Sequence, residues 1–226
     1  MSKSRLNFDF LQYLANTAHD NGTPDPDRIP PLSELSSQLG ISIATLREQL
    51  QVARVLGFVE VRPRTGIRRL PYSFGPSVSE SLSYAITLER SHFDTFAELR
   101  QQVEAGFWFQ AVESLDSNDH GDLFELVDTA ERKLTDQPIQ LPHKEHRRFH
   151  LAIFRGLKNP FVFGILEAYW DAYENVGLNR YAHLSYLQRV WSYHHKMASA
   201  ISSGDYDLGY NALIEHFDLI DTRSVD

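Results

Sequence analysis

Residues 41–70 constrain the fold of this chain more than any other stretch. Apolar residues recur there at helical spacing and can share one buried face: Leu46, Leu50, Ala53 and Leu56. Ser42 is a suitable N-cap, because its hydroxyl can accept a hydrogen bond from a free backbone N–H of the first turn. Gly57 suits the left-handed conformation that ends many helices. The stretch therefore predicts a helix that begins after Ser42 and ends near Gly57.

A β-hairpin is predicted directly after this helix. Residues 58–61 and 67–70 have the composition of strands, and Pro63-Arg64-Thr65-Gly66 between them has that of a turn. Two earlier helices are predicted over residues 6–20 and Leu32–Leu39, the second ended by a glycine. Three helices followed by a hairpin make a winged helix-turn-helix.

The charge of the same stretch favours nucleic acid as its partner. Residues 41–70 contain six arginines and two acids, a balance of +4, although the whole chain carries −8. Clustered arginine beside a helix-turn-helix is typical of DNA binding, while the alternative is a solvated basic hairpin. The residues expected to face DNA are Ser42, Ile43, Thr45, Arg47, Gln51 and Arg54 on the helix, and Arg64, Thr65 and Gly66 at the wing tip.

The composition limits the remaining classes of protein. The chain has no cysteine, so it has neither disulfides nor thiolate metal sites, which fits a cytoplasmic protein. Its first residues lack the apolar core of a signal peptide. No apolar run approaches the roughly 20 residues of a membrane span, so we expect no membrane partner.

Beyond the wing the sequence becomes almost entirely helical. Residues 73–77 contain proline and glycine and are expected to link a DNA-binding domain (1–72) to a second domain (78–226). Helices are predicted over 78–92, 93–115, 119–134, 142–157, 160–180, 183–203 and 206–222. Helices joined by short loops pack as an antiparallel bundle. The predicted fold class is therefore mainly α: an N-terminal winged helix-turn-helix plus a C-terminal all-α bundle.

Histidines of the second domain form a candidate metal site. His146 and His150 are four residues apart, so both rings project from one helix face. His194 and His195 lie on a later predicted helix, and either could be the one that points inward, while His216 lies on the last helix. Imidazole binds zinc, nickel, copper and iron. The alternatives are a surface pair at 146 and 150 and a hydrogen-bonded core histidine at 216.

These motifs resemble the GntR-type bacterial transcription regulators of the FadR-like group, which carry an FCD ligand-binding domain. In the first domain the resemblance rests on Leu39-Gly40-Ile41-Ser42, Arg47-Glu48, Leu50, Gly57-Phe58-Val59 and Gly66. In the second it rests on Glu98-Leu99-Arg100, Glu104, Phe149-His150, Gly156, Asn159, His194, Ala200-Ile201, Gly204-Asp205 and His216. It covers nearly the whole chain in order.

The resemblance implies a divalent metal held by one Asp and three His inside the bundle. It selects His194 over His195, and places His146 where the family usually has Asp. Four imidazoles favour zinc or nickel over manganese; the alternative is a weakened site with three ligands. The resemblance further implies a homodimer on operator DNA and a small carboxylate effector, for which we expect Arg100 and Asn159 as ligands.

The positions that read DNA depart from the family pattern. Ile43 and Ser33 stand where many members have arginine, whereas Arg47 is retained. Because arginine is the commonest direct reader of guanine, we expect a changed operator preference. The expected function is a metal-containing regulator whose DNA binding responds to an organic acid. An alternative makes the metal itself the signal, and a metalloenzyme with a vestigial DNA-binding domain is not expected, because His146 and His150 enclose no carboxylate base.

Overall fold

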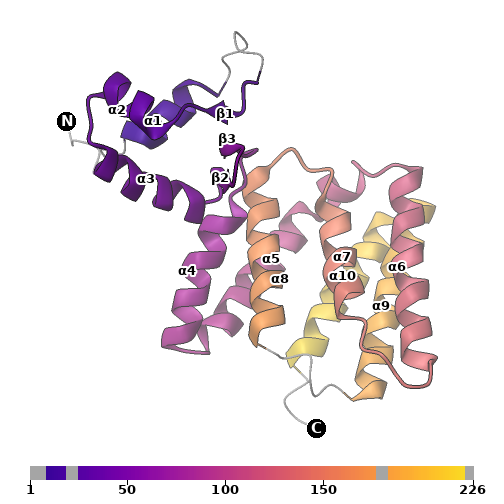
Figure 1. Cartoon of the computed structure of the whole chain (residues 1–226). Helices are drawn as coiled ribbons and strands as arrows, with labels where there is room; N and C mark the ends of the chain where they lie inside the picture. The colour runs from indigo at the N-terminus through magenta and orange to yellow at the C-terminus, as the bar shows by residue number, and fades with distance from the viewer. Residues whose placement is uncertain (1–8, 19–24, 177–182, 222–226) are drawn as a thin grey trace, which may run out of the picture. The chain divides into compact units, whose positions relative to one another are not determined.

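The computed structural model describes residues 9–18, 25–176 and 183–221. The chain divides into two compact units, Met1–Glu80 and Ser81–Asp226, which we call the N-terminal and C-terminal units. Figure 1 shows a small sheet with short helices in the first and long helices lying side by side in the second. The fold is mainly α with a winged helix-turn-helix, as the sequence predicted.

The N-terminal unit surrounds one small apolar core. Its helices are α1 (Asp9–Asn16), α2 (Leu32–Leu39) and α3 (Ile43–Val55). The core residues come from all three helices and from the sheet: Phe10, Leu14, Ile29, Leu35, Leu46, Leu50, Ala53, Val59 and Ile67. The predicted bounds of α2 are confirmed. The first helix was predicted over residues 6–20; it ends at Asn16, residues 17 and 18 form a turn, and residues 6–8 and 19–20 lie outside the described residues.

Both predicted ends of α3 are confirmed. The Ser42 hydroxyl accepts a hydrogen bond from the backbone N–H of Thr45 at 3.1 Å. Gly57 has φ +74°, the left-handed conformation predicted for it. One buried residue of α3 was not predicted: the Gln49 side chain accepts a hydrogen bond from the backbone N–H of Phe10 at 2.8 Å. That bond connects α1 to α3 and satisfies the buried amide oxygen of Gln49.

The hairpin is present, and a third strand joins it. Strands β2 (Val59–Arg62) and β3 (Gly66–Arg69) begin one residue later and one residue earlier than predicted. Strand β1 (Arg28–Ile29) pairs with β3, so all neighbours in the order β1-β3-β2 are antiparallel. A strand of two residues has no periodicity to detect, which explains why the sequence did not predict it.

The C-terminal unit is a helical bundle. Its helices are α5 (His92–Val112), α6 (Ser117–Thr135), α7 (His143–Phe154), α8 (Pro160–Val176), α9 (Leu184–Ser203) and α10 (Tyr206–Asp221). Helix α4 (Gly75–Leu88) begins three residues before the helix predicted from residue 78, so residues 75–77, which were expected to lie in the linker, are helical. The boundary between the two units falls within α4, between Glu80 and Ser81.

Large buried side chains fill the bundle. Helix α9 packs against α6 and α10, while α7 packs against α5, α6 and α8. Trp108, Trp191 and Phe149 are all at most 1% exposed. Burial of such aromatic rings contributes a large share of core stability. The cross-packed helices therefore form a fixed frame for side chains that point inward from α5, α7, α9 and α10.

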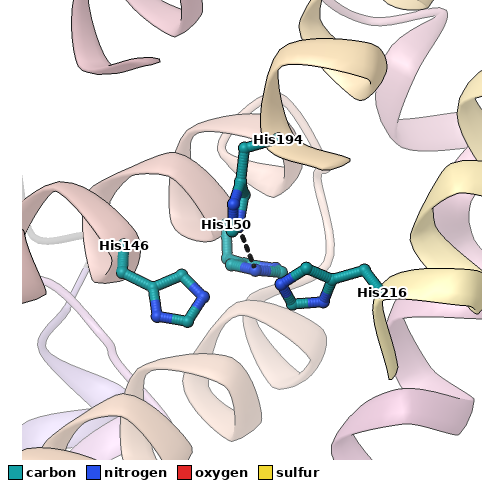
Figure 2. Close-up of side chains that lie close together, drawn as sticks. All are labelled: His146, His150, His194 and His216. Carbon is teal, nitrogen blue, oxygen red and sulfur yellow. Dashed lines mark hydrogen bonds between the residues drawn. The ribbon is translucent and has the colours of Figure 1, made fainter. Parts of the chain in front are cut away.

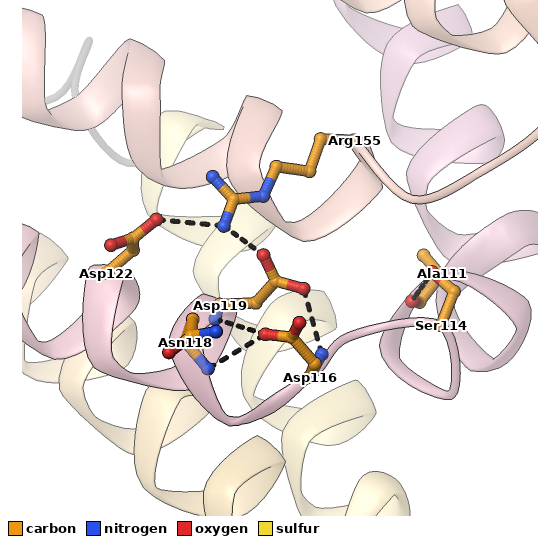
Figure 3. A network of polar contacts seen from close by, with 7 residues as sticks. All are labelled: Ala111, Ser114, Asp116, Asn118, Asp119, Asp122 and Arg155. Atoms are coloured by element: carbon orange, nitrogen blue, oxygen red, sulfur yellow. Dashed lines mark hydrogen bonds and ion pairs between the residues drawn. The ribbon is translucent and has the colours of Figure 1, made fainter.

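A polar network at one end of the bundle ties α6 to α7 (Figure 3). Asp116 and Asp119 form a capping box at the start of α6, in which the carboxylate of each residue accepts a hydrogen bond from the backbone N–H of the other. The Arg155 guanidinium, directly after α7, donates to both Asp119 and Asp122. This network satisfies free N–H groups of the first turn of α6 and holds the end of α7 beside it.

Candidate functional site

Four histidines meet inside the C-terminal unit (Figure 2). We call them the histidine cluster: His146, His150, His194 and His216. One ring nitrogen from each lies within 4.8 Å of the other three. The last three residues are at most 1% exposed, while His146 is half-buried with a buried Nε2 atom. The sequence predicted all four positions from their spacing and the family resemblance.

Helical geometry brings the four rings together. The spacing of four residues on α7 places the His146 and His150 rings 5.2 Å apart between centroids. His194 on α9 and His216 on α10 enter from the other side, with ring centroids 4.6 Å apart. His195 faces outward and contacts Glu131 at 3.4 Å. The structure thus separates the two neighbours of α9 as the resemblance had expected.

The cluster rings are held in the neutral form. Burial lowers the pKa of His146, His194 and His216 well below the usual range, and the adjacent imidazoles lower it further. Burial also lowers the pKa of His150, although the Glu104 carboxylate opposes this shift. Neutral imidazole is the form that binds metal ions.

Two buried charged residues of α5 lie behind the cluster. The Glu104 carboxylate is 3.3 Å from His150 Nδ1 through Oε1 and 3.4 Å from Arg100 Nη2 through Oε2. Burial alone would raise the pKa of Glu104, but Arg100 and His150 lower it overall. Since the Glu104 carboxylate lies beside Nδ1 of His150, the other ring nitrogen, Nε2, faces the other histidines and is 3.1 Å from His194 Nε2.

Hydrogen bonding leaves the cluster with free ligand atoms. His194 Nδ1 lies 2.8 Å from the Val190 carbonyl, which leaves Nε2 for a ligand. His146 Nε2 and both ring nitrogens of His216 are buried without hydrogen-bond partners among the described residues. Buried polar atoms normally have a partner, so nitrogens without one are available to bind a metal ion.

These residues fit a divalent metal. Zinc bound at about 2.0–2.1 Å by imidazole keeps its ligand nitrogens at most about 4.2 Å apart. Tetrahedral zinc holds its ligand nitrogens about 3.4 Å apart, so the cluster, with its nitrogens within 4.8 Å, would have to contract around the ion. Histidine ligands commonly have an acceptor on the other ring nitrogen, and Val190 and Glu104 supply acceptors for His194 and His150.

Arg100 and aromatic rings form one wall beside the cluster. The Arg100 guanidinium carbon lies 4.6 Å from the centre of the Tyr169 ring and 5.8 Å from that of Trp170. The Trp170 ring in turn lies 4.7 Å from His146 and 5.0 Å from His150. The sequence analysis gave Trp170 no role in the site. Its only signal in the sequence was its position in a long apolar helix.

Asn159, expected to bind the effector, lies at the N-terminus of α8. Its side chain accepts hydrogen bonds from the backbone N–H groups of Phe161 and Val162 at 3.1 and 3.3 Å. It precedes Trp170 by 11 positions, about 16 Å along a helix axis. The structure brings Arg100 to the histidine cluster and does not bring Asn159 there, whose role with an effector stays a prediction.

The residues expected to face DNA are all exposed. They are Ser42 at the N-cap of α3, Ile43, Thr45, Arg47, Gln51 and Arg54 on α3, Arg64 and Thr65 in the turn of the hairpin, and Gly66 at the start of β3. The turn is tight, since Arg64 has φ +70° and Gly66 has φ +83°. Contacts join two pairs of these residues: Ser42 with Thr45, as described for the cap of α3, and Arg54 with Gln51, whose side chain accepts a hydrogen bond from Arg54 at 3.0 Å.

Three other arginines near the wing have acceptors within the N-terminal unit. Arg68 forms two hydrogen bonds with Asp25, at 2.8 and 3.0 Å. Arg69 donates to the carbonyls of Leu14, Thr17 and Pro26 and to the Thr17 hydroxyl. Arg62 pairs with Glu60 at 2.9 Å. The +4 balance of residues 41–70 therefore overstates the charge available to phosphates, because part of it stabilises the fold.

Comparison with known proteins identifies the class. A sequence profile of the FCD domain matches residues 95–219. The chain is 23% identical over 205 residues to the Uxu operon transcriptional regulator of Escherichia coli (strain K12), covering 88% of this chain and 79% of that one. It is similar in fold to the structure of Streptococcus agalactiae GntR, with a TM-score of 0.68, 16% identity and coverage of 94% and 96%.

The winged helix-turn-helix followed by a helical bundle is the fold shared with the Streptococcus agalactiae protein. The chain belongs to the GntR family of transcriptional regulators with an FCD C-terminal domain. The Escherichia coli relative is named as a transcriptional regulator. Among the described residues, none of the helices combines the length and apolar character that a membrane span requires.

Proposed function

We propose that this regulator holds a divalent metal in the histidine cluster and changes its DNA affinity when a small organic acid binds beside that metal. The observation that carries the proposal is the convergence of four imidazoles, with one ring nitrogen from each within 4.8 Å of the others. Buried nitrogens of His146 and His216 have no hydrogen-bond partner among the described residues. Zinc and nickel suit a ligand set made only of imidazoles better than manganese does. Residues 1–72 serve as the DNA-binding domain, 73–77 as the linker and 78–226 as the sensing domain.

Arg100 is the residue that would hold the acid next to the metal. A guanidinium matches a carboxylate with two parallel hydrogen bonds. Arg100 is 1% exposed, and the Glu104 carboxylate contacts both Arg100 and His150. A metal-bound acid that also contacts Arg100 favours one arrangement of the helices that carry these ligands, which are α5, α7, α9 and α10.

On the DNA side, α3 enters the major groove with Arg47 as the principal reader of bases. Gln51 and Arg54 extend the same exposed face. Arg64, Thr65 and Gly66 bring the wing tip to an adjacent groove. A homodimer would place two such units on a two-fold operator, whose half-sites mirror the symmetry of the protein.

A matched pair of variants tests the metal. His194→Ala removes a cluster ligand, whereas His195→Ala removes its exposed neighbour. We expect stoichiometric zinc or nickel in the wild type and in His195→Ala, and loss of it in His194→Ala, measured by elemental analysis after dialysis. Equal metal content in both variants would contradict the proposal.

Fluorescence anisotropy tests the coupling to DNA. The DNA is the segment just upstream of the protein's own gene, with scrambled DNA as control. Titration of candidate acids onto the metal-loaded complex should shift its affinity by about 5–150-fold, the range of a coupling of about 1–3 kcal/mol. Acids that leave the affinity unchanged in every case would contradict the role of an effector.

A second candidate makes the metal itself the signal. The observation that favours it is the absence of a carboxylate from the four ligating side chains. The same anisotropy experiment separates the two functions. Metal added to stripped protein should change DNA affinity on its own under the second function, and only together with an acid under the first.

A further inference from the structure

The buried charges of the C-terminal unit limit which acids its site can take. Among its described residues three charged side chains are buried: Arg100, Glu104 and Glu145. Glu145 is neutralised by Lys133 at 2.7 Å. Arg100 and Glu104 carry opposite charges and lie 3.4 Å apart, so they sum to zero. Protein groups around the histidine cluster thus contribute no net charge.

The ligands add none either. Histidine binds a metal ion as the neutral imidazole, so four imidazoles leave a divalent ion with its full charge of about +2. A buried charge is costly unless an opposite charge accompanies it. The missing negative charge must therefore come from the bound acid, since the surrounding side chains do not supply it.

One edge of Arg100 is prepared for a second anionic group. Its Nε and Nη2 atoms are buried without a hydrogen-bond partner among the described residues. These two atoms carry the parallel N–H bonds with which a guanidinium binds a carboxylate side-on. The contact of Nη2 with Glu104, at 3.4 Å, is longer than an ordinary N–H···O bond of about 2.7–3.2 Å.

We infer that the effector is a dianionic acid, with one carboxylate for the metal and a second anionic group for the Nε–Nη2 edge of Arg100. The inference rests on the proposed function and narrows it to a class of ligand. A monocarboxylate would leave the buried site with an excess positive charge.

The test compares two ligands of nearly equal size and different charge. Succinate and its monomethyl ester are titrated onto the zinc-loaded full chain by calorimetry, with metal content checked before and after. We expect succinate to bind at least about tenfold more tightly, because a unit charge near a partly buried cation is strongly attracted. Equal affinity for the two ligands would overturn the inference while leaving the metal and DNA functions intact.

Two variants probe the origin of that preference. His146→Asp places a carboxylate among the ligands and lowers the charge of the site by one, so the preference for succinate should fall severalfold. His195→Asp adds the same charge on the exposed side of α9 and should leave the preference unchanged. An equal fall in both variants contradicts the charge argument.

The failures are distinguishable. If His146→Asp loses its zinc, the comparison of the two ligands on the wild type still decides the question. A wild type that takes up neither zinc nor nickel overturns the proposed function and this inference together. A wild type that holds metal and binds the monoester as well as succinate overturns this inference alone.

Discussion

His150 Nδ1 lies 3.3 Å from the Glu104 carboxylate, and neither side chain is exposed. A proton on His150 Nδ1 would lie towards this carboxylate, and Nε2 is the nitrogen directed at His194. Glu104 also lies beside Arg100, so one carboxylate orients a cluster ligand and neutralises the neighbouring cation. Under the proposed function it is a positioning residue, since it is not among the four histidines of the cluster.

Replacing Glu104 with Gln should lower metal affinity by about 10–100-fold, the usual effect of removing an outer partner of a histidine ligand. The expected cause is a less fixed His150 ring and an unneutralised Arg100. Competition with a fluorescent chelator measures the affinity. Glu113→Gln, an exposed acid at the end of the same helix, is the control and should behave as wild type.

Replacing Arg47 with Ala should weaken binding to the operator by about 1–3 kcal/mol if the side chain reads a base. Binding to scrambled DNA should change much less. Arg90→Ala removes an exposed arginine of the other unit and should leave both affinities unaltered. An equal loss on operator and scrambled DNA would instead assign Arg47 to a phosphate contact.

Two left-handed glycines allow a matched stability test. An added Cβ at Gly40 meets nothing within 4 Å, whereas at Gly57 it lies 2.6 Å from Pro76 Cγ. Gly40→Ala should therefore cost about 1–2 kcal/mol through its backbone alone. Gly57→Ala should cost about 1–3 kcal/mol more, because the rigid proline ring must move. Urea unfolding compares them, and equal losses would show that Pro76 yields freely.

The Asp25–Arg68 pair predicts a dependence on pH. Hydrogen bonds from Arg68 lower the pKa of Asp25, so the pair stabilises the fold when the carboxyl is ionised. That stabilisation is present above the unfolded pKa of about 3.9 and is lost as the pH falls through the lower folded value. Asp25→Asn should melt below wild type at pH 7, and the gap should close in acid. A gap that persists at pH 2 would assign the effect to packing.

Much of the fold could be predicted because its signals are local. The cap at Ser42, the left-handed Gly57 and the apolar spacing of α3 depend only on neighbouring residues, and each is confirmed. Strand β1 and the earlier start of α4 were missed for the opposite reason. Arg28 and Ile29 pair with β3, which lies about 40 residues further along the chain, so their strand depends on a long-range contact. Gly75-Pro76 begins a helix, although the same two residues also suit a turn.

The candidate site shows the same division. Helical spacing placed His146 and His150 on one face, but it could not tell a surface pair from a buried one. Choosing His194 over His195 required the family pattern. Adjacent residues of a helix point in different directions, and which of the two points inward depends on the register of α9. The contacts of Arg68 with Asp25, 43 positions away, could not be read from composition, which counted the arginine as free charge.

The histidine cluster also has a consequence for the lifetime of the protein. His146 and His216 are 70 positions apart, and an ion shared by them would connect two distant segments of the folded chain. Anything that binds only the folded form shifts the folding equilibrium towards it. The amount of regulator that survives proteolysis would then follow metal supply, so cellular abundance becomes a second readout of the same four side chains.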